Sequence, residues 1–467
     1  DRGVIVARTG RPLAWNDRTA VTDEFAKRVY ADFQGLAHAV GYVKPPAKDS
    51  AGFYYRDFFL GVDGAERAYN ATLAGQNGLK LTETDARGRL VSQAQVDPAV
   101  AGQKLALSVD AEVTQALYRA LAGVAHESRL QGAAGVVMDV RTGELLALTS
   151  YPNYPQQALT DGDSAIIKAL NKNPYRPFLD RATGGLYAPG SIVKPMVAAA
   201  ALTEGIITEN TKILSTGSIS VPNPYDPSRP SIFKDWRVNG LTDVRDALAV
   251  SSDIFFYEVG GGYQGQAGLG IAKLDQYFKM FGFGQDPGLA GFDGALGTIP
   301  TPEWKAKNFP TDKTWRIGDT YHTAIGQYGM LVSPLQAVRA AAAVANGGTL
   351  LTPTLIASST PQGTKIQVSS YSLQVVREGM RQGVTTGIAQ AINFTFVQAA
   401  AKTGTAEVGM RNEYQNAWVI GFWPYENPRY AFAVVLERLP AGTAVGGPRV
   451  MAEFFQYLNA NHPEYLQ

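Results

Sequence analysis

The chain has 467 residues but no cysteine and only four histidines. Without cysteine, the protein can form neither disulfides nor thiolate zinc sites, and it has no cysteine nucleophile. A zinc-protease motif beginning at His126-Glu127 would need a second histidine at position 130, which is Leu130. The GxSxG motif that marks many serine hydrolases is also missing. The sequence therefore predicts an enzyme or binding protein with no metal and no cofactor.

An excess of charge of either sign is also lacking, since 42 lysines and arginines balance 41 aspartates and glutamates. This balance argues against a nucleic-acid partner, which requires a basic field. No apolar run reaches the roughly 18–20 residues that span a bilayer. The sequence starts at Asp1 without a methionine, and we therefore expect an upstream segment, such as a signal or an anchor, to have been removed.

Two sets of predicted strands enclose a helical middle. Asp110 can cap a helix whose apolar residues recur at helical spacing to Val124, and Ser333 can cap another that stops at 347–348. GVVMDV and ELLALTS predict a hairpin, and AWVIGFW and RYAFAVVLER predict a second one near the end. The fold class expected is α+β, with an antiparallel sheet flanked by helices and a helical subdomain. The predicted secondary structure changes near residue 105, where short strands and turns give way to longer elements.

The stretch YAPGSIVKP places Ser191 and Lys194 one helical turn apart. A serine hydroxyl needs a neighbouring base to become a nucleophile, and a lysine can be that base only when its pKa is lowered by burial or by a second cation. The turn at 188–190 would start a helix near Ser191, with Pro195 in its first turn. The alternative is a helix cap beside a solvated lysine.

A second Ser-x-x-Lys, at Ser231 and Lys234, weakens the motif when it is taken alone. Its neighbours are turn residues, so we predict that it lies in a surface loop and is not a catalytic pair. Gly260-x-Gly262-x-x-Gly265 could indicate a dinucleotide fold, but the required strand and helix around it are not predicted.

Two later stretches add to the first. VSSDIFFYEVG supplies Ser251 and Asp253, and AKTGTAEVG supplies the Lys402-Thr403-Gly404 triplet followed by Thr405. If the triplet is a strand, Lys402 and Gly404 share a face, and the glycine leaves room for a ligand backbone to lie close and add a strand.

Ser-x-x-Lys, Ser-x-Asp and Lys-Thr-Gly, in this order, resemble the motifs of the penicillin-recognising acyltransferases. GDTYHTAIGQYGMLVSPLQ and NAWVIGFWPYENPRYAFAVVLE narrow the resemblance to class B penicillin-binding proteins, and RGVIVARTGRPLA and GVDGAERAYNATLAGQNG are similar to their pedestal segments. The resemblance implies a short, mainly β pedestal at 1–104 and a transpeptidase domain of β-lactamase-like fold at 105–467. Ala7 and Thr9 depart from the pedestal pattern.

The resemblance also implies a role for each motif residue. Ser191 would be the acylated nucleophile, Lys194 its base, and Ser251 a proton relay to the leaving amine. Asp253 would hold Lys194, and Lys402 would supply the positive charge that keeps Lys194 neutral. The substrate carboxylate would bind at Thr403, Gly404 and Thr405, and the backbone N–H groups of Ser191 and Thr405 would form the oxyanion hole.

The activity that this family implies is peptidoglycan D,D-transpeptidation. Stem peptides ending in D-Ala-D-Ala would acylate the serine, an amine would accept the acyl group, and β-lactams would inhibit. Asp253, where asparagine is commoner, is typical of elongation-type members. The family further implies the outer (periplasmic) face of the cytoplasmic membrane, an amino-terminal anchor and a polytopic membrane glycosyltransferase as partner. The alternatives are a D,D-carboxypeptidase, a β-lactam-hydrolysing or β-lactam-sensing domain, and a non-catalytic scaffold.

Overall fold

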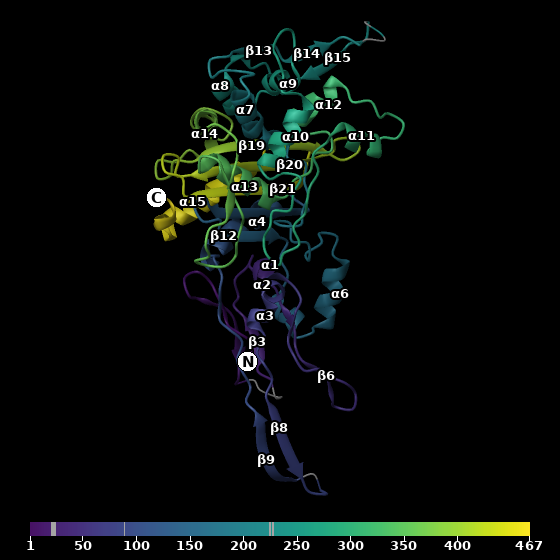
Figure 1. Ribbon diagram of the computed structural model, residues 1–467, viewed down its shortest axis with the longest axis vertical. Helices are drawn as coiled ribbons and strands as arrows, with labels where there is room; N and C mark the ends of the chain where they lie inside the picture. The colour runs from purple at the N-terminus through teal and green to yellow at the C-terminus, as the bar shows by residue number, and fades with distance from the viewer. Residues whose placement is uncertain (20–24, 88, 224–225, 227) are drawn as a thin grey trace.

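The computed structural model describes residues 1–19, 25–87, 89–223, 226 and 228–467. The molecule is elongated, with the predicted pedestal at one end and a sheet-containing body at the other (Figure 1). A long two-stranded hairpin forms the tip of the pedestal, and the chain's amino terminus lies between this hairpin and the body. In the described part of the chain, no helix has both the length and the apolar character needed to cross a membrane.

The pedestal combines short strands with three short helices in its described part. Its four-stranded sheet has the order β10-β1-β2-β3, in which β10 pairs parallel with β1 and extends the pedestal sheet just past residue 104. The hairpin at the tip is β8–β9. The bounds are β1 Ile5–Val6, β2 Pro12–Asp17, β3 Lys27–Tyr30, β4 Val43–Lys44, β5 Ala47–Lys48, β6 Tyr54–Arg56, β7 Leu60–Gly61, β8 Leu79–Thr84, β9 Leu90–Asp97, β10 Leu105–Ala106, α1 Ala37–Val40, α2 Gly64–Ala68 and α3 Asn70–Leu73.

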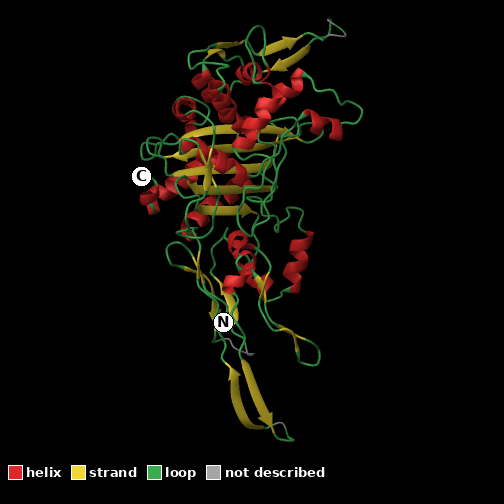
Figure 2. Ribbon diagram, viewed as in Figure 1, coloured by secondary structure: helices red, strands yellow, loops and turns green. Residues whose placement is uncertain are grey.

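A five-stranded antiparallel sheet of order β12-β11-β21-β20-β19 forms the centre of the body (Figure 2). Alternate residues of β21 face two separate cores: Phe432 and Val434 pack with α4 and α15, whereas Ala433 and Val435 pack with α7 and α13. The bounds are β11 Gly132–Asp139, β12 Leu145–Tyr151, β19 Ala400–Val408, β20 Tyr414–Trp423, β21 Tyr430–Pro440, α4 Ala111–Glu127, α7 Lys194–Thr203, α13 Pro334–Ala345 and α15 Gly447–Asn461. The predicted α+β class is confirmed.

Two helices begin where the sequence predicts. The Asp110 carboxylate accepts from the N–H groups of Glu112 and Val113, and it caps α4. Ser333 and Gln336 form a reciprocal capping box at the start of α13, which ends at Ala345 before the two glycines. Both predicted hairpins, β11–β12 and β20–β21, are also present.

The helical subdomain lies beyond β19, on the side of the sheet away from the pedestal (Figure 1).

The prediction of a loop for the second Ser-x-x-Lys is wrong, because Ser231 to Lys234 form β15, which pairs with β14. Alternation along a strand sends residues i and i+3 to opposite faces, so these two side chains do not form a catalytic pair. Gly260 and Gly262 end α9 and open no helix. Further bounds are α5 Gln156–Thr160, α6 Ser164–Lys172, β13 Ile213–Ser215, β14 Ser218–Val221, β15 Ser231–Lys234, β16 Gly240–Thr242, α8 Val244–Val250, α9 Asp253–Gly261, α10 Gly270–Met280, α11 Pro302–Asn308, α12 Ile317–Ala324, β17 Thr349–Leu351, β18 Gly363–Lys365 and α14 Ser370–Thr385.

Candidate active site

Ser191 lies in a single 3-10 turn, Gly190–Val193, that leads directly into α7. Gly190 has φ +55, a left-handed conformation that glycine adopts without strain. Pro195 falls in the first turn of α7, as predicted. Ser191 is partly exposed at the mouth of a helix that is otherwise buried, whereas Lys194 is fully buried. The serine is therefore open to a ligand while the lysine is shielded from water.

Lys194 contacts the Ser251–Asp253 segment. Its Nζ donates to Asp253 Oδ1 at 2.6 Å, to the Ser251 carbonyl at 2.8 Å and to Ser251 Oγ at 3.3 Å. Within the described residues, Lys194 makes no hydrogen bond to Ser191, although the two side chains were predicted to lie within bonding reach. The carboxylate of Asp253 therefore holds this lysine in the free protein.

Ser251 lies at the junction of α8 and α9 in a left-handed conformation, with φ +59. A non-glycine residue in this region costs of order 1 kcal/mol, and such residues gather at functional sites. The turn allows the Ser251 side chain to face both lysines, while Ser252 caps α9 by accepting from the Phe255 N–H. The tight turn thus brings Ser251 and Asp253 to Lys194 together.

Lys402 reaches the same hydroxyl from the sheet. Its Nζ donates to Ser251 Oγ and to the Thr403 carbonyl, both at 2.8 Å, and the side chain is 1% exposed. Burial and the Lys194 cation lower the pKa of Lys402 well below its usual value, although Asp253 acts to raise it. This direction runs against the predicted role of Lys402 as the source of positive charge. In the free site, Lys194 is paired with Asp253, and Lys402 gives up its proton more readily than an ordinary lysine.

The Lys-Thr-Gly triplet lies in β19, at the edge of the sheet. A Cβ added at Gly404 would lie 2.7 Å from the Pro189 carbonyl oxygen and 2.8 Å from a methyl of Ile192. The face of Gly404 is therefore packed against the Ser191 turn, and its predicted role in substrate binding stays a prediction. Thr403 is half-buried and Thr405 is exposed, and the strand remains open for pairing along its outer edge.

The two segments predicted to supply the oxyanion hole pack against each other. A Cβ on Gly190 would be 2.4 Å from the Thr405 carbonyl oxygen and 3.2 Å from the Ala406 nitrogen. The residue before Ser191 thus packs directly on the backbone of Thr405. Both packing contacts depend on glycine, Gly190 on one side and Gly404 on the other.

Asp235 is a site residue that the sequence did not reveal. Its buried carboxylate accepts from Ser215 Oγ, Ser252 Oγ, Asn239 Nδ2 and the N–H groups of Asp253 and Ile254. Burial acts to raise the pKa of Asp235, but these hydrogen bonds hold it below the ordinary value. Nothing in the sequence signalled Asp235, because this residue belongs to none of the three motifs. Asp235 fixes the turn that presents Ser251 and Asp253.

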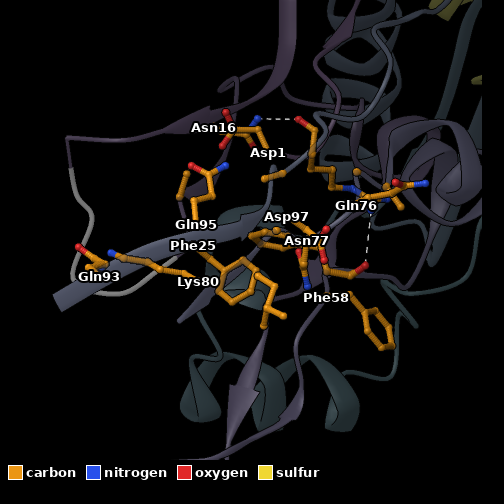
Figure 3. Close-up of a pocket in the computed structure, with 18 residues that line it drawn as sticks. Asp1, Asn16, Phe25, Phe58, Gln76, Asn77, Lys80, Gln93, Gln95 and Asp97 are labelled. Atoms are coloured by element: carbon orange, nitrogen blue, oxygen red, sulfur yellow. Dashed lines mark hydrogen bonds between the residues drawn. The ribbon is translucent and has the colours of Figure 1, made fainter. Parts of the chain in front are cut away.

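A cleft in the pedestal lies far from these residues (Figure 3). It has a volume of about 830 Å³ and is lined by amides, aromatic rings and the start of the chain. Among the described residues, no group of three His, Asp or Glu side chains could hold a metal ion. The polar groups of the Ser191 site are its hydroxyls, its two lysines and the Asp253 carboxylate.

Comparison with known proteins gives the family of this chain. The family model for the penicillin-binding protein transpeptidase domain matches residues 133–456, and that for the penicillin-binding protein dimerisation domain matches residues 19–107. The peptidoglycan D,D-transpeptidase MrdA of Escherichia coli K12 is 34% identical over 90% of this chain and 70% of its own length. The predicted boundary at residue 104 stays a prediction.

Two solved structures extend the likeness over almost the whole chain. Pseudomonas aeruginosa PBP2 in complex with WCK 5153 has a TM-score of 0.79 and 29% identity, covering 99% of this chain and 97% of that one. Helicobacter pylori PBP2 in complex with MreC has a TM-score of 0.80 and 26% identity, covering 98% and 97%.

The chain belongs to the transpeptidase family of penicillin-binding proteins. It is an enzyme of the peptidoglycan D,D-transpeptidase type, and the MrdA relatives confirm the predicted elongation-type subgroup.

Proposed function

We propose that Ser191 carries the acyl group in the cross-linking of peptidoglycan stem peptides by this chain. The observation that carries the proposal is the convergence of two buried lysines on one hydroxyl, Ser251 Oγ, at 3.3 and 2.8 Å, next to the turn that leaves Ser191 partly exposed. Two lysines at one buried site cannot both stay charged cheaply, which makes one of them available as a base. This arrangement favours acyl transfer over a purely structural role.

The first half-reaction uses Ser191 as nucleophile. Its Oγ attacks the carbonyl of the penultimate D-alanine of a stem peptide, and Lys194, in its neutral form, takes the hydroxyl proton that later reaches the leaving amine through Ser251. The backbone N–H groups of Ser191 and Thr405 stabilise the oxyanion. Ser251 passes a proton to the leaving amine, and D-alanine departs.

The second half-reaction reverses these steps. An amine of a neighbouring stem attacks the acyl-enzyme, gives up its proton through Ser251, and Ser191 is released with its hydroxyl restored. Thr403 and Thr405 hold the terminal carboxylate of the donor before acylation. The reaction takes place on the outer side of the cytoplasmic membrane, to which an amino-terminal segment outside this chain attaches the enzyme.

A β-lactam mimics the donor and forms an ester with the same serine. The formation and lifetime of this ester distinguish the proposed function from a β-lactamase and from a scaffold. A fluorescent penicillin is expected to label the protein and to stay attached for hours. Release of the label as hydrolysed penicillin within minutes would instead indicate β-lactamase activity. No labelling at all would indicate a scaffold.

We further propose that the pedestal binds a membrane partner, a polytopic glycosyltransferase acting beside this enzyme. Both strands of the hairpin β8–β9 are exposed along their whole length, register places Leu81 opposite Ala94, and the exposed Val96 lies at the bulge next to this pair. An isolated two-stranded hairpin with open edges is marginally stable in water and is a ready site for pairing. The PBP2 of H. pylori, which shares this fold, was solved with MreC bound.

Charge on the exposed apolar residues of the hairpin is expected to block partner binding without affecting chemistry. Leu81→Asp with Val96→Asp should acylate penicillin at the wild-type rate yet fail to restore rod shape when the full-length gene is expressed in elongation-deficient cells. Leu296→Asp, at a residue of similar exposure in the body of the protein (60% against 64% for Leu81), is the matched control and should restore shape. Restoration of shape by the doubly charged hairpin would refute this partner surface.

A further inference from the structure

The indole of Trp418 is bonded to the turn that carries Ser191. Its Nε1 donates to the Ala188 carbonyl oxygen at 2.9 Å, three residues before the serine and 230 positions away in sequence. Trp418 is 1% exposed in β20, directly opposite Gly404 of β19. Its ring also meets Tyr187 edge-on, with centroids 6.0 Å apart. The side chain therefore joins the sheet to the approach to the nucleophile.

The other side of the turn is held by backbone. Tyr187 and Val332 exchange two backbone hydrogen bonds, at 3.0 and 2.9 Å, and Gly190 donates its N–H to the Gly326 carbonyl at 3.0 Å. A Cβ on Gly326 would lie 2.2 Å from the Gly190 carbonyl oxygen, so the two segments are in close contact. These bonds fix the turn toward the helical subdomain, and Trp418 fixes it toward the sheet.

We propose that Trp418 is a positioning residue that sets Ser191 relative to the Thr405 backbone. Pro189 and Gly190 already pack against Gly404 and Thr405 with no space for one extra carbon. The indole bond to Ala188 determines where along β19 this packing occurs. A shift of about 1 Å between a nucleophile and its oxyanion donors can cost about 100-fold in rate. This inference rests on the proposed role of Ser191.

The same strand offers a matched control. Trp423 is fully buried in β20 and donates its Nε1 to a backbone carbonyl, that of Tyr465, at 2.8 Å. It packs in the core formed with α4 and α15, on the opposite face of the sheet from Trp418. Replacing either tryptophan with phenylalanine removes one indole N–H and a similar volume, but only the first change touches the Ser191 turn.

The test compares Trp418→Phe with Trp423→Phe in the intact chain, using penicillin. Trp418→Phe is expected to lower the acylation rate constant about 10- to 100-fold, each tenfold corresponding to about 1.4 kcal/mol. The dissociation constant of the noncovalent penicillin complex that precedes acylation should not change. Because Trp423 is distant from the Ser191 turn, the acylation rate constant of Trp423→Phe should stay within about two-fold of wild type. Its melting temperature should fall at least as far as that of Trp418→Phe. Equal rate constants in the two variants would overturn the proposal.

A second variant isolates the hydrogen bond and covers failure of Trp418→Phe to fold. Incorporation of 3-benzothienylalanine at position 418 keeps the bicyclic shape but replaces the N–H with sulfur. The melting temperature is expected to stay near wild type while the acylation rate falls as in Trp418→Phe, and a wild-type rate would overturn the positioning role. The adduct is located by mass spectrometry in the wild-type chain, and an adduct away from Ser191 would refute the proposed function itself.

Discussion

Lys194→Arg is expected to lower the rate of penicillin acylation by about 10³-fold or more. A general base contributes roughly 10²–10⁴-fold, and a guanidinium keeps its proton at any accessible pH. The buried site also holds Lys194 by three contacts to Ser251 and Asp253. Arginine can keep the charge but cannot accept the Ser191 proton. Stopped-flow measurement with a chromogenic β-lactam gives the rate constant.

Lys402→Arg is the comparison that separates the two lysines. If Lys402 serves as a charge and a donor, arginine should retain acylation within about 100-fold of wild type. The lowered pKa of Lys402 makes this comparison informative, because that direction suits a group that gives up its proton. Equal losses in the two variants would contradict the division of roles, and a greater loss in Lys402→Arg would assign the base to Lys402.

Asp235→Asn is expected to reduce both stability and acylation. In addition to the N–H of the adjacent residue, five donors from other residues bond to the Asp235 carboxylate. In asparagine, an NH₂ group would replace one of the two accepting oxygens and would face some of these donors. Loss of hydrogen bonds to a buried charged group predicts destabilisation by about 3 kcal/mol. Release of the Ser251 turn predicts a fall in acylation of about 100-fold. Urea unfolding and stopped-flow kinetics measure the two effects.

The pH dependence of stability and a control variant test whether the Asp235 carboxylate causes these two effects. Because the folded pKa of Asp235 lies below its ordinary value of 3.8, its stabilisation is complete above that value and is lost as pH falls through the folded pKa. The difference in unfolding free energy between wild type and Asp235→Asn should therefore narrow below about pH 4. Asp243→Asn, which keeps an oxygen acceptor at the cap of α8, should cost less than about 1 kcal/mol and leave acylation unchanged. Equal kinetic effects in both variants would contradict the account of Asp235.

The elements with strong local signals could be predicted from the sequence. Asp110 and Ser333 cap helices with regular apolar spacing, and each helix forms as expected. The strand at Ser231 was missed because its four residues stand among turn residues, and its structure depends on pairing with β14. Short strands of this kind are determined by tertiary contacts more than by local propensity.

The motif residues and one of their contacts, between Asp253 and Lys194, could be expected from the sequence and its family resemblance, but the remaining contacts could not. The i, i+3 spacing predicted a bond from Lys194 to Ser191, whereas the structure pairs this lysine with Asp253, 59 positions away. Asp235 and Trp418 carry no motif, and their partners become visible only when the register of the sheet and the fold of the turn are known. Long-range hydrogen bonds of buried polar groups have no local signature.

The central claim is that Ser191 is the acylated nucleophile, and one measurement tests it directly. The protein is incubated with penicillin, digested, and the adduct is located by tandem mass spectrometry, with Ser191→Ala and Ser231→Ala treated in parallel. We expect the adduct on the peptide that contains Ser191, its loss in Ser191→Ala and its retention in Ser231→Ala. An adduct that persists in Ser191→Ala would contradict the account.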